Sequence, residues 1–152
     1  SAAVPDTGEY LRLKDPRYLS ILATAAPLHD AGLLVIPTEL SQLPVPTTPA
    51  DAAAFQSHST VAAQVLTEMA GEPNAAAPDL LLAAELVRHH HERWDGTGYP
   101  DELEGPAIPL SARVTAIVSA YDAQRTRKPH RPALSHLMAV RLILTEMPGV
   151  FD

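Results

Sequence analysis

Three consecutive histidines stand directly before a turn rich in glycine and proline, in the stretch HHHERWDGTGYP at residues 89–100. Neutral imidazole is a common ligand for divalent transition metals. Neighbouring residues on an α-helix diverge by about 100°, so two of them can face one ion only near a helix end. Gly96, Gly98 and Pro100 place such an end just after the histidines. The stretch therefore predicts metal ligands at the end of a helix.

Two other histidine positions suit the same chemistry. His29 is followed directly by Asp30, whose carboxylate can bridge two ions, and His58 falls on the apolar stripe of an expected helix. Imidazole and carboxylate ligands suit Fe, Mn, Co, Ni or Zn, and the absence of cysteine excludes thiolate ligands. Taken singly, each group has an ordinary structural explanation, such as a hydrogen-bonded core histidine at position 58. His130 and His136 are assigned to the surface.

The elements that must position these side chains are helices. Residues 18–28 predict a helix ending near His29, with Pro27 in its last turn, and the four prolines of residues 36–49 predict a long extended loop. Thr48 and Asp51 match a capping box ahead of a helix that starts at Pro49. The apolar stripe of that helix is formed by Phe55, Ala62, Val65 and Met69.

Three further helices are expected along the rest of the chain. One starts at Pro78 and ends at the histidine run, one is capped by Ser111, and one spans residues 134–147 and stops at Pro148. In the helix capped by Ser111, four apolar side chains are expected to face inward, with Thr115, Ser119 and Asp122 on a neighbouring polar strip. The inward set is Val114, Ile117, Val118 and Tyr121. No alternation typical of a strand persists, so the fold class is all-α.

The composition limits the classes of function. A chain of 152 residues, with 46% hydrophobic and 19% charged residues, predicts one folded domain. The formal charge of −7 argues against binding long nucleic acid, which requires many phosphate contacts from Lys and Arg. We expect no membrane span and no signal sequence, and hence a cytoplasmic protein or a piece of a larger one.

Several motifs together resemble the HD-GYP family, bacterial domains that hydrolyse the second messenger cyclic di-GMP. The matching motifs are PLHDAG at 27–32, HHERWDGTGYP at 90–100, LEGPAIPLSAR at 103–113 and IPLSARVTAIVSAYDA at 108–123. The resemblance implies a compact helical bundle of the HD-domain type over residues 16–152, after an N-terminal segment at 1–15. It also implies that His29, Asp30, His58, His90 and His91 are metal ligands, with Asp30 central to catalysis and His89 an outer neighbour.

The resemblance further implies a loop that faces the substrate or a partner protein, and basic side chains that meet phosphate. The loop residues are Asp95, Gly96, Gly98, Tyr99 and Pro100. The candidates for phosphate contact are Arg113, Arg127, Lys128 and Arg131.

The chain departs from the family pattern at three points. Leu33 stands where the family has a lysine, Ser119 stands where it has a ligating aspartate, and no histidine precedes His29. One family metal position uses His29, Asp30, the missing aspartate and the missing histidine; the other uses Asp30, His58, His90 and His91. We therefore expect one bound ion, rather than two or three, and impaired or absent phosphodiesterase activity.

Two functions of different classes remain open on the sequence. The first is a metal-dependent phosphodiesterase acting on cyclic di-GMP or a related nucleotide. The second is a non-catalytic signalling module that binds a partner protein or a nucleotide through the loop at 95–100. Leu33 and Ser119 favour the second, whereas the complete second ligand set and the unaltered GYP turn favour the first. A homodimer is compatible with both.

Overall fold

The computed structural model describes residues 7–41, 46–127, 131–146 and 149–151. Within these residues the chain forms α-helices and 3₁₀ turns and no strand, with one isolated antiparallel bridge between Asp95 and Glu104. The all-α prediction is confirmed. The elements are α1 (Thr7–Arg12), α2 (Pro16–Ala25), η1 (Ala26–Leu28), η2 (Ala31–Val35), α3 (Thr38–Ser41), α4 (Pro49–Ala70), α5 (Ala77–His89), η3 (Gly105–Ala107), α6 (Leu110–Arg125) and α7 (His136–Glu146).

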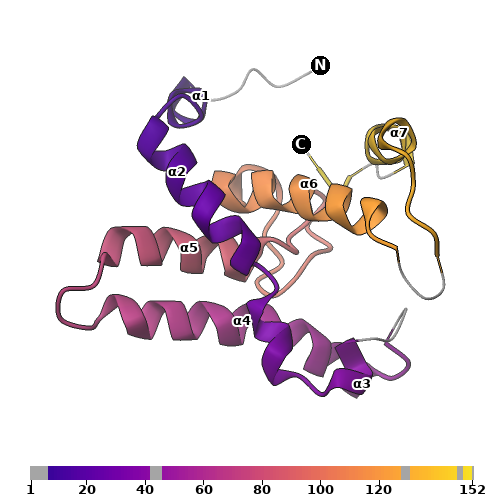
Figure 1. Ribbon diagram of the computed structural model, residues 1–152, viewed down its shortest axis with the longest axis horizontal. Coiled ribbons are helices and arrows are strands. Elements are labelled where there is room, and N and C mark those ends of the chain that lie inside the picture. The colour runs from indigo at the N-terminus through magenta and orange to yellow at the C-terminus, as the bar shows by residue number, and fades with distance from the viewer. Residues whose placement is uncertain (1–6, 42–45, 128–130, 147–148, 152) are drawn as a thin grey trace.

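Helices α4 and α5 lie side by side and antiparallel, with α2 crossing the pair and α6 running beside α5 (Figure 1). Their contact faces make the hydrophobic core, in which Leu86 and Val87 of α5 are fully buried. The other core residues are Leu22 and Ala25 of α2, Ala62 of α4 and Ala83 of α5. This core fixes the positions of α2, α4 and α5, which carry or adjoin the predicted metal ligands.

The start of α4 is set by local chemistry that the sequence predicts. The Thr48 side chain accepts a hydrogen bond from the Asp51 backbone N–H at 3.1 Å, and the Asp51 carboxylate accepts one from the Thr48 N–H at 3.1 Å. These bonds form the expected capping box. His58 is 0% exposed, as its place on the apolar stripe predicts. Val65 and Met69 are about half exposed, at 50% and 49%, so the buried stripe does not reach the end of α4.

The prediction for α6 is wrong in its cap and in its buried face. Ser111 lies inside the helix, where its hydroxyl donates to the Glu85 carboxylate at 2.8 Å, and no side chain caps α6. The buried residues are Ser111, Ala112, Arg113 and Thr115, whereas Ile117 and Val118 are 39% and 53% exposed. Val114 packs against the core as predicted, whereas of the expected polar strip Thr115 is buried, Ser119 is half-buried and Asp122 is exposed. Ser111 is buried because Glu85 of α5 accepts its hydrogen bond.

The proline-rich loop and the last helix also differ from expectation. The loop at 36–49 contains the short helix α3 (Thr38–Ser41), and residues 42–45 lie outside the described residues. Helix α7 starts at His136 rather than at residue 134, and the Ser135 hydroxyl accepts a hydrogen bond from the Met138 N–H at 3.3 Å, as a residue before a helix start does. Its expected end at Met147 and Pro148 lies outside the described residues.

Helix α1 lies within the segment at 1–15 that the sequence sets apart, and it is tied to the bundle. Glu9 of α1 forms an ion pair with Arg113 of α6. The Arg113 guanidinium in turn lies over the Trp94 ring, 5.6 Å from its centroid. The domain boundary at residue 16 stays a prediction.

One described stretch, Pro16–Val35, is apolar and long enough to cross a membrane by length and composition, with a hydropathy of 1.3. The sequence predicts no membrane span because no segment has about 18 uninterrupted apolar residues. In the structure it is broken into α2, η1 and η2. A single stretch of this kind is weak evidence for a membrane span.

Candidate metal centre and substrate cleft

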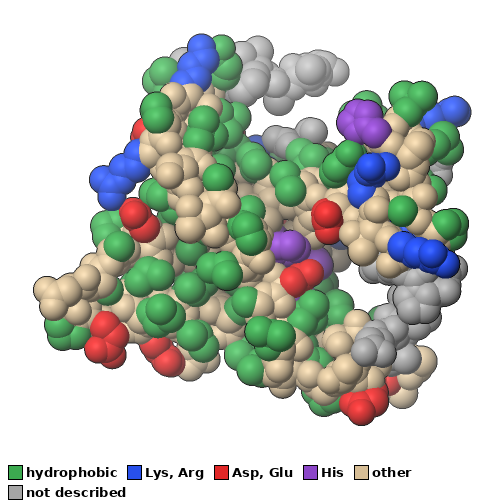
Figure 2. All heavy atoms as spheres, viewed as in Figure 1, with side chains coloured by type: hydrophobic (Ala, Val, Ile, Leu, Met, Phe, Trp, Pro, Cys, Tyr) green, Lys and Arg blue, Asp and Glu red, His purple; other side chains and the backbone are tan. Residues whose placement is uncertain are grey.

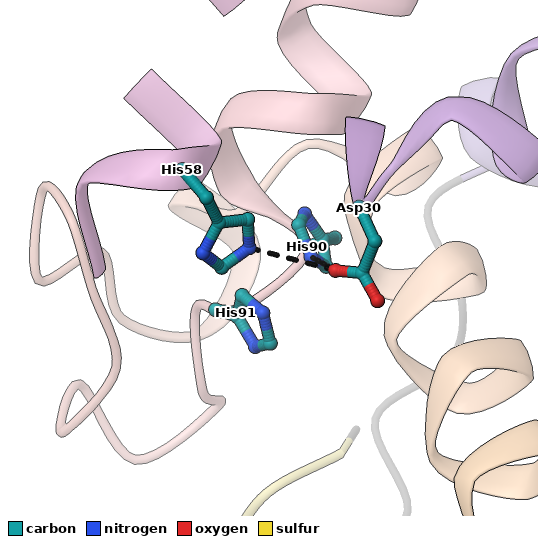
Figure 3. A group of neighbouring side chains, drawn as sticks. All are labelled: Asp30, His58, His90 and His91. Carbon is teal, nitrogen blue, oxygen red and sulfur yellow. Dashed lines mark ion pairs between the residues drawn. The ribbon is translucent and has the colours of Figure 1, made fainter. Parts of the chain in front are cut away.

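Four side chains from three separate parts of the chain converge on one point. Asp30 lies between η1 and η2, His58 lies in α4, and His90 and His91 follow the last turn of α5 (Figure 3). Each offers one ligand atom, and the four atoms all lie within 4.8 Å of one another. The structure thus brings together the four residues that the resemblance assigns to the second metal position.

Backbone carbonyls orient three of the imidazoles in the region. In each case Nδ1 lies at hydrogen-bonding distance from the carbonyl oxygen three residues earlier. The distances are 2.7 Å from His29 to Ala26, 2.6 Å from His58 to Phe55 and 2.8 Å from His90 to Val87. A proton on Nδ1 leaves Nε2 unprotonated, which is the form that binds a metal.

The buried ring nitrogens fit a divalent ion. His58 Nε2 and His90 Nε2 are buried and have no hydrogen-bond partner among the described residues. They lie 3.5 Å and 3.6 Å from Asp30 Oδ1. Two ligands about 2.1 Å from one tetrahedral ion are themselves about 3.4 Å apart. A transition metal would therefore satisfy two buried groups that otherwise lack a partner.

His29 holds the other side of the Asp30 carboxylate. Its Nε2 lies 3.3 Å from Asp30 Oδ2, while Oδ1 faces His58 and His90. Burial opposes ionisation of Asp30, but the hydrogen bonds and charges of His29 and His90 outweigh it and lower the carboxyl pKa. The same hydrogen bond raises the pKa of His29, against the effect of burial. Asp30 is thus ionised at neutral pH, and 47% of its side chain is exposed to solvent.

His58 and His91 are held neutral by their surroundings. Burial is the main cause that lowers the pKa of both, and for His91 the neighbouring His90 and His58 contribute further. The pKa of His91 falls to about 2. Neutral imidazoles beside an ionised carboxylate are the protonation states that metal binding needs.

The lowered pKa values predict acid sensitivity of the metal-free protein. The unfolded chain takes up protons on His58 and His91 near pH 6.5, and the folded chain takes them up only at lower pH, so stability falls as the pH falls. His91 alone should account for a loss of about 2 kcal/mol between pH 7 and pH 5. His29 has a raised pKa, so its contribution is complete below pH 6.5 and declines only at higher pH.

Urea unfolding of chelator-treated protein at the two pH values measures this loss. The variant His91→Gln lacks the titrating ring and should lose correspondingly less stability over the same interval. Equal losses for the parent and the variant would contradict the account.

Gly32 allows the Asp30 segment to approach α4. A Cβ atom at Gly32 would lie 2.0 Å from the His58 carbonyl oxygen, so the η2 backbone packs directly on the helix that carries this ligand. Sequence reasoning recognised Gly32 only as part of the PLHDAG motif.

Gly32→Ala should push η2 away from α4 and destabilise the fold by about 1–3 kcal/mol. It should also lower metal affinity, because Asp30 moves with η2. Urea unfolding provides the measurement. Gly71→Ala is the matched control, since a Cβ at that position meets only the Glu68 carbonyl oxygen, at 3.3 Å. Similar destabilisation by the two substitutions would argue against the close approach.

The loop predicted to face substrate folds back against the end of α5. Gly96 has a φ of +73°, and a Cβ at Gly98 would lie 2.4 Å from the Arg93 backbone nitrogen, so both positions require glycine. Asp95 accepts hydrogen bonds from the Arg93 and Thr97 side chains, which lower its pKa. The Tyr99 ring stacks on His91, with centroids 4.7 Å apart, and Pro100 follows it. The loop therefore forms a wall beside the candidate ligands.

The residues on either side of His90 and His91 bind groups outside the cluster. Arg88 and His89 both bind the Asp101 carboxylate, at 2.6 Å and 2.9 Å, so His89 is turned away from the cluster. Glu92 is buried, and its carboxylate accepts the backbone N–H groups of Asp101 and Leu103. Sequence reasoning missed Glu92; a carboxylate between a helix end and a glycine-rich turn is the signal that could have indicated it.

A cleft of about 410 Å³ opens beside the cluster, between the loop and α6. His90 and His91 line it together with Ser119, Tyr99 and Arg93. Ser119 thus shares a cleft with two of the candidate ligands. The space-filling view shows histidine and acidic side chains reaching the surface near the middle of the face where α2, α4 and α6 meet (Figure 2).

The basic candidates for phosphate contact differ in position. Arg113 is buried and paired with Glu9, so its placement does not support a phosphate contact. Arg131 donates to the Gln124 side chain and to the Ala123 carbonyl, and both of these residues line the cleft. Arg127 is exposed beyond the end of α6, and Lys128 lies outside the described residues.

The remaining polar candidates lie away from the cluster. Asp15 caps α2 through the Arg17 N–H, and Glu9 pairs with Arg113, so neither replaces the missing upstream histidine. His136 is exposed and bonds the Tyr121 hydroxyl at 2.9 Å, in agreement with its assignment to the surface. His130 lies outside the described residues.

Comparison with known proteins gives the class of this fold and site. The profile of the HD domain matches residues 1–152. A cyclic di-GMP phosphodiesterase of Vibrio cholerae is 37% identical over 144 residues, which cover 95% of this chain and 29% of the relative. The cyclic di-GMP phosphodiesterase response regulator RpfG of Xanthomonas campestris is 33% identical, over 87% of this chain and 33% of the relative.

A third relative is named for a different cyclic dinucleotide. The 3'3'-cGAMP-specific phosphodiesterase 2 of Vibrio cholerae is 33% identical over 73% of this chain and 20% of its own length. The chain belongs to the HD-domain family, and its relatives confirm the resemblance to the HD-GYP type. It spans about a third or less of the length of these relatives.

Proposed function

We propose that the chain is a metal-dependent phosphohydrolase domain of bacterial second-messenger signalling, with cyclic di-GMP as its substrate class and with weak catalysis. The observation that carries the proposal is the convergence of Asp30, His58, His90 and His91, with two buried ring nitrogens lacking a partner. The names of the relatives support the substrate class, since several are cyclic di-GMP phosphodiesterases.

The four clustered side chains would hold one divalent ion, of Fe, Mn, Zn, Co or Ni. Such an ion supplies activation of water and stabilisation of charge on the phosphoryl oxygens. Asp30 keeps its charge because His29 binds its second oxygen, and the buried His58 stays neutral and ready to ligate. The loop wall with Tyr99 and the Arg93 guanidinium borders the cleft in which a nucleotide would lie.

Weak catalysis is expected because the residues around the four candidate ligands lack groups that the family has. Ser119 contributes a hydroxyl to the cleft where the family has a carboxylate, and a hydroxyl is a poor ligand for a dication. Leu33 of η2 supplies no cation for a phosphate. His29 of the first metal position is present, but no described side chain upstream of it takes the place of the family's upstream histidine. We therefore expect one ion rather than two or three.

The second candidate function is a non-catalytic signalling module that binds a protein or nucleotide through the loop at 95–100. The losses at Leu33 and Ser119 favour it, because the family has a phosphate-facing lysine and a ligating aspartate at these two positions. A cytoplasmic location, a signalling partner and a homodimer remain proposals, and binding of long nucleic acid is not expected at a net charge of −7.

Elemental analysis of the purified protein, together with a cyclic di-GMP turnover assay, tests the proposal. We expect about one transition metal per chain and slow turnover that His58→Ala abolishes. Metal binding without turnover would favour the second candidate. Absence of bound metal after incubation with Mn²⁺, Co²⁺ or Zn²⁺ would overturn the first.

A further inference from the structure

His91 differs from the other candidate ligands in how its ring is oriented. The rings of His58 and His90 are each fixed by a bond from Nδ1 to a backbone carbonyl. Among the described residues, the His91 ring has no hydrogen bond of this kind. Outside the histidines, its ring contact is with Tyr99, stacked at 4.7 Å between centroids with an interplanar angle of 22°. Stacking on Tyr99 therefore takes the place of the missing hydrogen bond.

Tyr99 is in turn held by the segment that follows it. Its backbone N–H donates to the His91 carbonyl at 3.3 Å. Two residues later the chain is fixed by Glu92, whose Oε1 accepts the Asp101 N–H at 2.7 Å and whose Oε2 accepts the Leu103 N–H at 3.0 Å. On the other side, Gly98 packs against the Glu92 backbone, where a Cβ would lie 2.5 Å from the Glu92 Cα.

Glu92 borders the cleft, but it is suited to hold this segment because both of its carboxylate oxygens are already engaged. It is 3% exposed, and both carboxylate oxygens are engaged by backbone N–H groups. A buried carboxylate that accepts two such bonds forms strong, charge-assisted contacts. Removing one of them leaves a backbone N–H group of this segment without its acceptor, which loosens the segment.

We propose that Glu92 is a positioning residue that fixes the Tyr99 ring and, through it, the orientation of the His91 imidazole. The orientation of His91 then sets the affinity of the cluster for a divalent metal. This consequence for affinity rests on the proposed function, whereas the orientation of the ring is a property of the metal-free protein. Partners that orient a metal ligand typically change affinity by about 10–100-fold.

Glu92→Gln is the first test, because it keeps the side-chain volume and replaces one acceptor with an amide that faces a backbone N–H. We expect Co²⁺ affinity, measured by competition with a chelator, to fall about tenfold. In the metal-free protein, the ring protons of His91 should lose the upfield NMR shift caused by the Tyr99 ring. Glu104→Gln makes the same chemical change at an exposed position of the same loop and should leave both readouts unchanged.

Substitutions of Tyr99 test the route through the ring and do not require the Glu92 variant to fold. Tyr99→Phe retains a stacking ring and should bind Co²⁺ like the parent, whereas Tyr99→Ala should lose about as much affinity as Glu92→Gln. Because both changes act through one ring, the double variant Glu92→Gln/Tyr99→Ala should be no weaker than the weaker single variant.

Unchanged Co²⁺ affinity and an unchanged His91 shift in Glu92→Gln would overturn the inference, as would fully additive losses in the double variant. If the parent binds no Co²⁺, the proposed metal site is refuted, but the proposed orientation of the His91 ring is not. The NMR shift in the metal-free variants then still decides whether Glu92 and Tyr99 orient His91.

Discussion

His90→Ala is expected to lower the affinity for Co²⁺ by at least about 100-fold, since loss of a ligand should exceed the cost of losing a partner that only orients one. The His90 side chain is 0% exposed, its Nε2 has no partner among the described residues, and it lies 3.6 Å from Asp30 Oδ1. Removing it takes away one of the four donors of the cluster. Chelator competition monitored by Co²⁺ absorption measures the change.

The adjacent histidine supplies the control. His89 lies next in the run but bonds Asp101 and the Glu85 carbonyl, outside the cluster. His89→Gln retains a donor for Asp101 and should change Co²⁺ affinity by less than about threefold, well short of the loss of a ligand. An equal loss in the two variants would mean that the histidine run acts through the fold and not as ligands.

Ser119→Asp combined with Leu33→Lys is expected to raise cyclic di-GMP turnover at least tenfold above the parent. This increase corresponds to an activation barrier that is lower by about 1.4 kcal/mol or more. Ser119 shares the cleft with His90 and His91. The family pattern has a ligating carboxylate at this position, so the substitution is expected to restore a ligand for a second ion together with His29 and Asp30. Leu33 lies next to Gly32 in η2 and is half-buried. The aliphatic part of a lysine at this position can pack on apolar surface while its amine stays in solvent.

The test compares metal content and turnover of the parent, both single variants and the double variant. The effects need not add, because the two positions serve one cluster. A folded double variant that binds no additional metal and remains as slow as its parent would contradict this prediction. The missing upstream ligand would then be the decisive loss, or the domain would act by binding a partner.

The sequence predicts best those features that depend on neighbouring residues. Thr48 and Asp51 form the expected capping box because both partners lie within one helical turn. His58 faces the core because it falls on a helical stripe that packs on α5. The histidine run lies at a helix end, as the turn at Gly96 and Gly98 predicts.

Features that depend on distant partners were not predictable in the same way. The buried face of α6 is polar because Ser111 meets Glu85, which is 26 residues away in the chain. Arg113 is occupied by Glu9, from a segment that the sequence sets apart from the domain. The role of Glu92 depends on backbone N–H groups of a loop whose path no periodicity reveals. Each of these requires knowledge of which elements pack together.

Anomalous diffraction at the absorption edge of the bound metal, from crystals of the purified protein, tests the central claim most directly. The account predicts a single strong peak per chain, within ligand distance of Asp30, His58, His90 and His91. Two fully occupied ions in the cleft, or an ion bound without these four side chains, would contradict it.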